Sequence, residues 1–297
     1  MRVALTGATG FLGGHVLDRL LAEGHSVRAL TRREQPPCAG TVWVRGSLED
    51  QATLRSLCEG CQAVVHVAGV VNGSAEAFDR GNRMGTEAML AAAPHDARFV
   101  HVSSLAAREP GLSNYGRSKR AAEGSVVASP LDWRIVRPPA IYGPGDTDNL
   151  DLFRAAKLGV MPLPPSGRLS VIHAEDLARL IAALVVSEVG RVSYDADDGM
   201  PGGWTHGAYA RAIGHALGRR VLPLPLPAAA IRIAARLDGL LRGRRAKLTP
   251  DRARYMVHRD WTIDPSRRPP PELWQPRIGT AAGLAATAAW YKAHGWL

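Results

Sequence analysis

The first half of the chain alternates between short apolar runs and longer stretches in which apolar residues recur at helical spacing. The runs predict strands at Arg2–Thr6, Val27–Leu30, Thr41–Val44, Ala63–Val67, Arg98–Val102 and Trp133–Val136. The stretches predict helices at Phe11–Glu23, Glu49–Cys58, Ala75–Ala92 and Asn114–Val127. This alternation is typical of βαβ units, and continuous apolar runs are typical of parallel strands that are covered on both faces.

The pattern therefore predicts the α/β class, with a doubly wound parallel sheet (Rossmann fold) and a smaller, mostly helical substrate lobe. Residues 1–146 are expected to form the dinucleotide-binding domain. Beyond them the alternation weakens and prolines interrupt the helical stretches, so residues 147–170 and 199–297 are assigned to the substrate lobe. Residues 171–198 hold two short apolar runs around a helical stretch, and we expect them to return to the main sheet.

A glycine-rich segment, Thr6-Gly-Ala-Thr-Gly-Phe-Leu-Gly13, joins the first predicted strand to the first predicted helix. Gly7 permits a tight turn, Gly10 lets the backbone approach a pyrophosphate, and Gly13 lets the helix pack closely on the strand. The start of the helix adds free N–H groups and the positive end of the helix dipole. The segment predicts a dinucleotide phosphate site. The alternative is a glycine-rich turn that binds no ligand.

The residues that follow the second predicted strand indicate which dinucleotide is bound. An acid there would hydrogen-bond the ribose 2′-hydroxyl of NAD, but the segment reads Thr31-Arg-Arg33. A guanidinium suits the additional 2′-phosphate of NADP, because it stays charged and can bind a phosphate with two hydrogen bonds. The sequence thus favours NADP over NAD, through Arg32. Solvated surface charges are the alternative for both arginines.

Tyr115 and Lys119 lie four residues apart at the start of a predicted helix, so their side chains share one helix face. A neighbouring ammonium is expected to lower the pKa of the phenol, which would let Tyr115 exchange a proton with a substrate oxygen. Ser103 and Ser104 follow the fifth predicted strand, at the sheet edge where ligands bind in such folds. Together these residues predict a proton-transfer site. An exposed Tyr–Lys pair without a function is the alternative.

These motifs resemble the extended short-chain dehydrogenase/reductase superfamily, also called the NAD-dependent epimerase/dehydratase family, over nearly the whole chain. The matching segments are Thr6–Gly13, Val64–Gly69, Asn82–Thr86, Val102–Ser104, Tyr115 with Lys119, Arg137–Gly145 and Val171–Ala178. The resemblance implies that Tyr115 is the catalytic acid/base, that Lys119 holds the nicotinamide ribose, and that Ser104 contacts the reacting oxygen. It also implies a homodimer that pairs helices of the main sheet.

The resemblance further implies which residues contact the cofactor. They come from the glycine turn, the ends of the predicted strands and the catalytic helix. The expected contacts are Gly7, Thr9, Gly10, Phe11, Leu12, Gly13, Arg32, Ser47, Leu48, Val67, Ala68, Gly69, Val102, Tyr115, Lys119, Pro138 and Ile141.

Three departures from the family pattern bear on the substrate. Ser104 and Tyr115 are only eleven residues apart, a shorter segment than nucleotide-sugar epimerases of the family have. Ser47 stands where the family usually has an aspartate, which alters the expected adenine contact. Arg168 lies close to a phosphate-binding position of the sugar-nucleotide enzymes, in a register that differs by one residue. The short segment makes a nucleotide-sugar substrate less favoured, while Arg168 stays open as a substrate ligand.

Three functions remain open from the sequence. The leading one is an NAD(P)-dependent reductase or dehydrogenase of a small-molecule carbonyl or hydroxyl substrate. The second is a nucleotide-sugar epimerase or dehydratase that uses the same hydride step transiently. The third is a dinucleotide-binding regulator or assembly subunit without catalysis, because a fold does not fix a function.

Charge and cysteine usage add little to this picture. Lys and Arg outnumber Asp and Glu by 37 to 27, but the excess is spread along the chain and does not predict nucleic-acid binding. Cys58 and Cys61 have no second pair to complete a zinc site, and three histidines on or beside predicted strands lack ligand spacing, so no metal is expected. No targeting or membrane-spanning segment is predicted, and a cytoplasmic location follows as the default.

One segment of the lobe has an amphipathic pattern. Residues 228–241 place apolar side chains beside Arg232 and Arg236, and a basic run, Arg242–Lys247, follows. Packing against the chain's own domain or a partner is the favoured use of this helix, and a membrane-surface role is the alternative.

Overall fold

The computed structural model describes residues 1–243 and 248–297, and its central element is a seven-stranded sheet. All neighbouring strands are parallel, in the order β11-β6-β5-β4-β1-β2-β3. The strands are β1 (Arg2–Thr6), β2 (Ser26–Thr31), β3 (Thr41–Arg45), β4 (Ala63–His66), β5 (Arg98–Val102), β6 (Asp132–Arg137) and β11 (Val192–Asp195). The order reverses between β1 and β4, and this switch point is where doubly wound sheets bind their ligands. The predicted fold class is confirmed.

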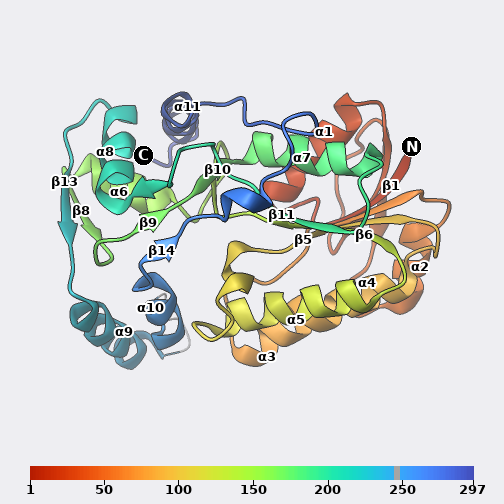
Figure 1. Cartoon of the computed structure of the whole chain (residues 1–297), viewed down its shortest axis with the longest axis horizontal. Coiled ribbons are helices and arrows are strands. Elements are labelled where there is room, and N and C mark those ends of the chain that lie inside the picture. The colour runs from red at the N-terminus through yellow and green to blue at the C-terminus, as the bar shows by residue number, and fades with distance from the viewer. Residues whose placement is uncertain (244–247) are drawn as a thin grey trace.

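Helices cover both faces of the sheet (Figure 1). One face carries α1 (Phe11–Ala22) and α7 (Ala174–Val186), whose apolar sides share one core with β1, β4 and β5. The other face carries α2 (Gln51–Cys58), α4 (Gly85–Ala92) and α5 (Asn114–Ala128), which share a second core with the same sheet. Because both faces are covered, the strands need the apolar runs seen in the sequence.

The helix expected at 75–92 is divided into three parts. These are α3 (Ala75–Phe78), a π-helical turn η1 (Asp79–Met84) and α4. Within η1 the buried Asn82 side chain accepts from Val70 N at 2.7 Å and donates to Val70 O at 3.0 Å. It also donates to Ser118 Oγ at 2.8 Å, which ties this turn to α5. The wider turn therefore sets the position of α5, and such π turns are frequent near functional sites.

The remaining elements form small sheets and helices at one end of the main sheet (Figure 1). The helices are α6 (Leu150–Lys157), α8 (His206–Ala216), α9 (Ala228–Arg242), α10 (Pro250–Met256) and α11 (Thr280–Ala293), with two 3₁₀ turns, η2 (Leu105–Arg108) and η4 (Pro265–Arg267). The strand pairs are β7 (Ala140–Tyr142) with β10 (Val171–His173) and β8 (Val160–Leu163) with β13 (Leu222–Pro225), and β9 (Arg168–Leu169) lies between β12 (Trp204–Thr205) and β14 (Asp260–Trp261). Within residues 171–198, α7 covers the main sheet and β11 extends it beside β6.

Hydrogen bonds between side chains and backbone groups fasten this end to the main sheet. The Arg108 guanidinium donates to the carbonyls of Asp260 and Thr262, which joins η2 to β14. Asp176 in α7 accepts from the backbone N–H groups of Arg277 and Ile278 at 3.0 and 2.9 Å, which joins α7 to the segment before α11. Among residues 1–243 and 248–297, no helix combines the length and apolarity needed to cross a bilayer.

Candidate active site

The glycine turn has the tight geometry that its sequence predicts. Gly7 has φ +78°, and a Cβ there would lie 2.8 Å from Ala68 N. A Cβ on Gly13 would lie 1.8 Å from Gly7 O, so α1 touches the turn through a position without a side chain. Gly10 N donates to Gly7 O at 2.9 Å, and Gly10 caps α1 without a side-chain hydrogen bond. The first N–H groups of α1 are thus not covered by a capping side chain and can face an anion.

Strand β4 and the residues that follow it link the glycine turn to helix α5. Thr6 Oγ1 accepts from Ala68 N at 3.2 Å and lies 2.7 Å from His66 Nδ1, which joins the ends of β1 and β4. Gly69 is exposed, and a Cβ built on it would lie 3.8 Å from Lys119 Nζ. The glycine turn and Lys119 therefore lie at the same edge of the sheet, at its switch point, where sheets of this class form their ligand crevice.

The loop after β7 lies against the start of α1. Pro144 O lies 3.2 Å from His15 Nε2, and a Cβ on Gly145 would lie 3.9 Å from the Phe11 ring. Pro138 is buried and accepts from Leu105 N at 2.8 Å, while Ile141 is partly buried against the core. Among the cofactor contacts predicted in this region, Phe11 therefore lies beside the loop. Pro138 is buried, and Ile141 is partly buried.

Arg32 and Arg33 follow β2 with exposed side chains. In the part of the chain that the structure describes, neither guanidinium takes part in a hydrogen bond or an ion pair, so both are available to an external anion. Ser47 and Leu48 follow β3 and are partly buried. Ser47 Oγ accepts from Glu49 N at 3.2 Å, so this hydroxyl supports its own loop.

Tyr115 is held in the first turn of α5, where Ser113 caps the helix by accepting from Gly116 N at 3.0 Å. A hydrogen bond with Ser104 lowers the pKa of the phenol, but burial raises it by more, so the net direction is upward. The expectation that Lys119 lowers this pKa is therefore wrong. The physical reason is that desolvation of the phenolate outweighs the stabilising contacts. At neutral pH the phenol is protonated.

Lys119 is buried one turn further along α5. Its Nζ donates to Val102 O at 2.8 Å, which fixes the ammonium at the end of β5. Burial lowers the pKa of Lys119 to about 8, while the negative charge of Glu123 acts in the opposite direction. The side chain is thus a cation at neutral pH whose charge is poorly solvated.

A buried network behind Lys119 was missed by the sequence analysis. Glu123 accepts from Arg137 Nε and Nη2, both at 2.7 Å, and from Ser103 Oγ at 2.6 Å. Ser103 therefore faces the interior, and of the serine pair it is Ser104 that faces Tyr115. The position of Glu123, four residues after Lys119, was the available signal. Its partner Arg137 lies on β6 and could not be assigned from spacing.

Aromatic and acidic side chains surround Tyr115. The Phe78 ring lies 5.8 Å from the tyrosine ring, and the negative charge of Asp148 acts to raise the pKa of the phenol. Burial, and then the nearby Tyr115, raise the pKa of Tyr255 of α10, which stacks on Trp261 at 4.3 Å. No motif marks Tyr255 in the sequence, because only the packing of the lobe brings α10 beside α5.

The other residues singled out in the sequence are buried or hydrogen-bonded in ways that suit a structural role. Cys58 and Cys61 are buried free thiols whose pKa burial raises. Arg168 Nε and Nη2 donate to the carbonyls of Gly202 and Gly203 at 2.5 and 2.9 Å, so its guanidinium braces a loop. His101 stacks on His66 at 5.6 Å within the sheet. Within the described ranges, no three His, Cys, Asp or Glu side chains form a group that could hold a metal ion.

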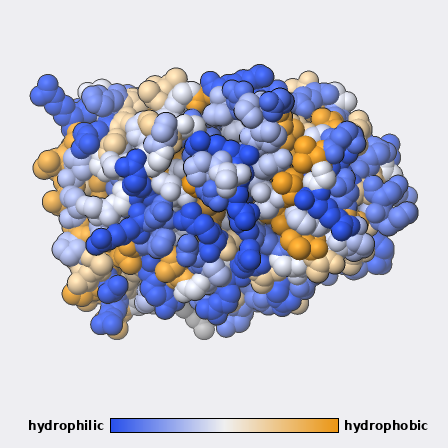
Figure 2. Space-filling model, viewed as in Figure 1, coloured by the Kyte–Doolittle hydropathy of each residue, from blue (hydrophilic) through white to orange (hydrophobic). Residues whose placement is uncertain are grey.

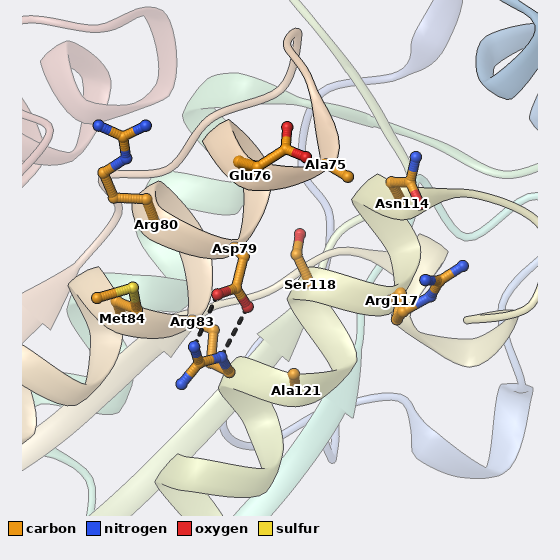
Figure 3. Close-up of a pocket in the computed structure, with 10 residues that line it drawn as sticks. All are labelled: Ala75, Glu76, Asp79, Arg80, Arg83, Met84, Asn114, Arg117, Ser118 and Ala121. Carbon is orange, nitrogen blue, oxygen red and sulfur yellow. Dashed lines mark hydrogen bonds and ion pairs between the residues drawn. The ribbon is translucent and has the colours of Figure 1, made fainter.

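A hollow of about 660 Å³ opens beside the catalytic helix, between α3, η1 and the start of α5. Figure 3 shows Asn114, Arg117 and Ser118 of α5 on one side of it and the Asp79–Arg83 ion pair on the other. None of the residues of the glycine turn line this hollow. The hollow is therefore distinct from the switch point of the sheet, where Lys119 Nζ lies 3.8 Å from the position that a Cβ on Gly69 would take.

Comparison with known proteins assigns the family. A family model described as NAD(P)H-binding matches residues 7–188. The chain belongs to this NAD(P)H-binding family. The resemblance inferred from the motifs is thereby confirmed, and the match begins at Gly7 of the glycine turn.

The relatives of the chain include a named reductase, which supports an oxidoreductase. The chain is 39% identical to a ceramide reductase of Caulobacter vibrioides, over 99% of this chain and 96% of that protein. Its fold matches MoeE5 in complex with UDP-glucose and NAD, with 21% identity, a TM-score of 0.76 and 99% of both chains covered. It also matches human epimerase family protein SDR39U1 with NADPH, with 21% identity, a TM-score of 0.74, and coverage of 97% of this chain and 99% of that one. At such identities the two structures support the fold alone.

Proposed function

We propose that the chain is an NADPH-linked reductase that acts through Ser104, Tyr115 and Lys119 on a ketone of a ceramide-like lipid. The observation that carries this proposal is the buried Lys119, which is fixed on Val102 O at 2.8 Å one helical turn from Tyr115, with Ser104 near enough to lower the pKa of the Tyr115 phenol. The full-length similarity to a ceramide reductase supports the substrate class.

The residues of the crevice fit a dinucleotide with an additional phosphate. At Gly7 and Gly13 the turn is packed too closely to admit a Cβ, which keeps it tight, and the uncovered start of α1 suits the pyrophosphate. Arg32 offers an exposed guanidinium to the 2′-phosphate, and Lys119 can hold the nicotinamide ribose. When bound, NADPH supplies the hydride for the substrate carbon.

Tyr115 supplies the proton, and Ser104 and Lys119 position the groups beside it. The raised pKa keeps the Tyr115 phenol protonated at neutral pH, so it is ready to donate to the carbonyl oxygen during reduction. Ser104 orients that oxygen by a hydrogen bond. The Lys119 ammonium is fixed on Val102 O at 2.8 Å, where its charge is poorly solvated and can hold the nicotinamide ribose.

The test is turnover of a ceramide analogue whose secondary carbinol has been oxidised to a ketone. We expect Tyr115→Phe to lower kcat about 10²–10⁴-fold, because it removes the general acid while keeping the ring. NADPH affinity, measured by fluorescence titration, should stay within a few-fold of wild type. Tyr209→Phe, which removes a hydroxyl from the lobe core, is the matched control and should turn over normally.

Two outcomes would count against the proposal. Full turnover by Tyr115→Phe would remove the tyrosine from the chemistry. Binding of UDP-glucose together with tightly held NAD, and no oxidation of NADPH by the ketone, would instead favour the epimerase alternative.

A further inference from the structure

The outward side of helix α9 carries large apolar side chains. Ile233 and Leu237 are 56% and 52% exposed, and Leu240 and Leu241 are 82% and 84% exposed. Ile231 and Ala235, on the opposite side, are buried against Ala253 of α10. The sequence expectation that this helix packs against its own domain therefore holds for its inner side only.

The angular positions of these residues make the outer side a continuous stripe. At about 100° per residue, Ile233, Leu237, Leu240 and Leu241 fall within roughly 100° of one another, away from the buried pair. Arg232 and Arg236 lie along one margin of this stripe and are exposed. A surface helix usually presents polar residues outward, so α9 has the reverse arrangement.

The apolar surface continues onto β13, which leads directly into α9. Leu222 and Leu224 of this strand are 63% and 46% exposed. Figure 2 shows apolar side chains along this edge of the molecule, at the left and lower left of the view, with hydrophilic ones beside them. The α9 face is defined here as Leu222, Leu224, Ile233, Leu237, Leu240 and Leu241.

The chain around this face is strongly basic. Between Gly199 and Pro250 the sequence has nine Lys or Arg residues and a single acid, Asp238. Asp238 is already engaged by Arg242 at 3.2 Å and by Leu248 N at 2.8 Å. One of the nine basic residues, Arg242, ends α9, and three follow it in residues 244–247, which lie outside the described ranges.

We propose that the α9 face docks on an anionic lipid bilayer, with its leucines in the headgroup region and its arginines on the lipid phosphates. Helices with an apolar stripe and basic margins bind membranes in this way, without crossing them. A second copy of the chain is a poorer occupant, because it would bring two like-charged segments together. A bilayer with anionic headgroups offers both the apolar and the negative surface.

The α9 face is connected to the candidate active site by α10. Ala253 of this helix packs under α9, and Asp251 accepts from Asn114 N at 3.0 Å at the start of α5. Tyr255 reaches the neighbourhood of Tyr115. A docked α9 would thus hold the lobe side of the crevice at the membrane. The docking itself does not depend on the proposed reaction and can be measured without cofactor or substrate.

The test is co-sedimentation of the full chain with vesicles of phosphatidylcholine alone, and with vesicles of phosphatidylcholine and phosphatidylglycerol in equal parts. We expect binding to the anionic vesicles that weakens as salt is added. Removing both charges in Arg232→Gln/Arg236→Gln should lower the partition coefficient about 25-fold, at about fivefold per basic residue. Leu240→Gln/Leu241→Gln should lower it at least about tenfold, through lost apolar burial.

The matched control is Val42→Gln/Val127→Gln, which changes two similarly exposed apolar residues of the nucleotide-binding half and should bind as wild type. Circular dichroism would verify that each variant is folded. Absence of binding to anionic vesicles, or equal binding by all variants, would overturn the proposal. Self-association without lipid that Leu240→Gln/Leu241→Gln abolishes would also overturn it, and would assign the face to a second copy.

Discussion

The nucleotide-binding half buries several polar and charged side chains, whereas the lobe exposes large apolar ones. In the first half, Lys119, Glu123, His66 and His101 are buried between strands and helices. In the lobe, α9 leaves large apolar side chains in the open, among them Leu241. Burial in the first half removes these polar groups from water and holds them in fixed positions. The exposed apolar surface of the lobe is of the kind that an external partner covers.

The two regions also differ in how closely their backbones are packed. Around the glycine turn, backbone atoms approach so closely that a single Cβ has no room. On α9, Gly239 has no heavy atom within 4 Å of the position its Cβ would take. Equivalent substitutions should therefore have opposite effects in the two regions.

Gly13→Ala should produce the largest effect. Its Cβ would meet Gly7 O at 1.8 Å, and a backbone atom cannot move aside without opening the turn. We expect the free energy of unfolding to fall by about 2–4 kcal/mol, with loss of NADPH binding. Urea denaturation and NADPH fluorescence measure the two effects.

Two controls sharpen this contrast. Gly239→Ala should raise the free energy of unfolding by about 0.5–1 kcal/mol, because alanine is the better helix former at an open position. Gly14→Ala, one residue along α1, meets its nearest atom at 3.8 Å and should leave NADPH binding intact. Equal NADPH affinities for Gly13→Ala and Gly14→Ala would show that the turn is not the phosphate cradle.

Exposed arginines of the two regions should differ in a second way. Arg32→Ala is expected to weaken NADPH binding about ten- to a hundredfold, the scale of one charge-assisted hydrogen bond, and to leave NADH binding unchanged. Arg33→Ala and, in the lobe, Arg236→Ala are the matched controls. An isothermal titration with both dinucleotides measures the effect. If Arg32→Ala weakened NADH equally, the guanidinium would not be reading the 2′-phosphate.

Much of the nucleotide-binding half could be predicted because its signals are local. Strand and helix periods gave the alternation, and the glycine turn and the Tyr115–Lys119 pair each lie within one short segment. The strand ends then bring these segments together at one edge, as the parallel topology requires. The same reasoning selected Ser104 and Arg32, whose roles stay predictions.

The predictions that failed concerned burial and contacts between residues that are far apart in the sequence. The sign of the Tyr115 pKa shift was wrong because only the folded protein shows that desolvation exceeds the stabilising contacts. Glu123 was missed because its partner Arg137 lies on a different element. The helical period at 75–92 was correct on average, yet it could not show the wider turn that Asn82 requires. For α9 the pattern gave the helix, but not which side remains uncovered.

The smallest predicted effect concerns acid stability of the buried polar core. His101 is 1% exposed, and among the described residues neither ring nitrogen has a hydrogen-bond partner. Burial, and then the charges of Lys119 and His66, hold the pKa of His101 well below its usual value. The unfolded chain therefore binds more protons below the ordinary histidine pKa, so the stability present above about pH 6.5 is lost as the pH falls.

His101→Leu should remove this part of the decline and leave the protein about 1–2 kcal/mol less sensitive to a change from about pH 7.5 to about pH 5, by urea denaturation at both values. His215→Leu, at an exposed position of the lobe, is the matched control and should decline as wild type does. Near neutral pH, His101→Leu should be at least as stable as wild type, because it removes a buried polar group without a partner. An undiminished acid decline in His101→Leu would mean that the pH dependence arises elsewhere, and would weaken the contrast between a half that buries titratable groups and a lobe that exposes apolar ones.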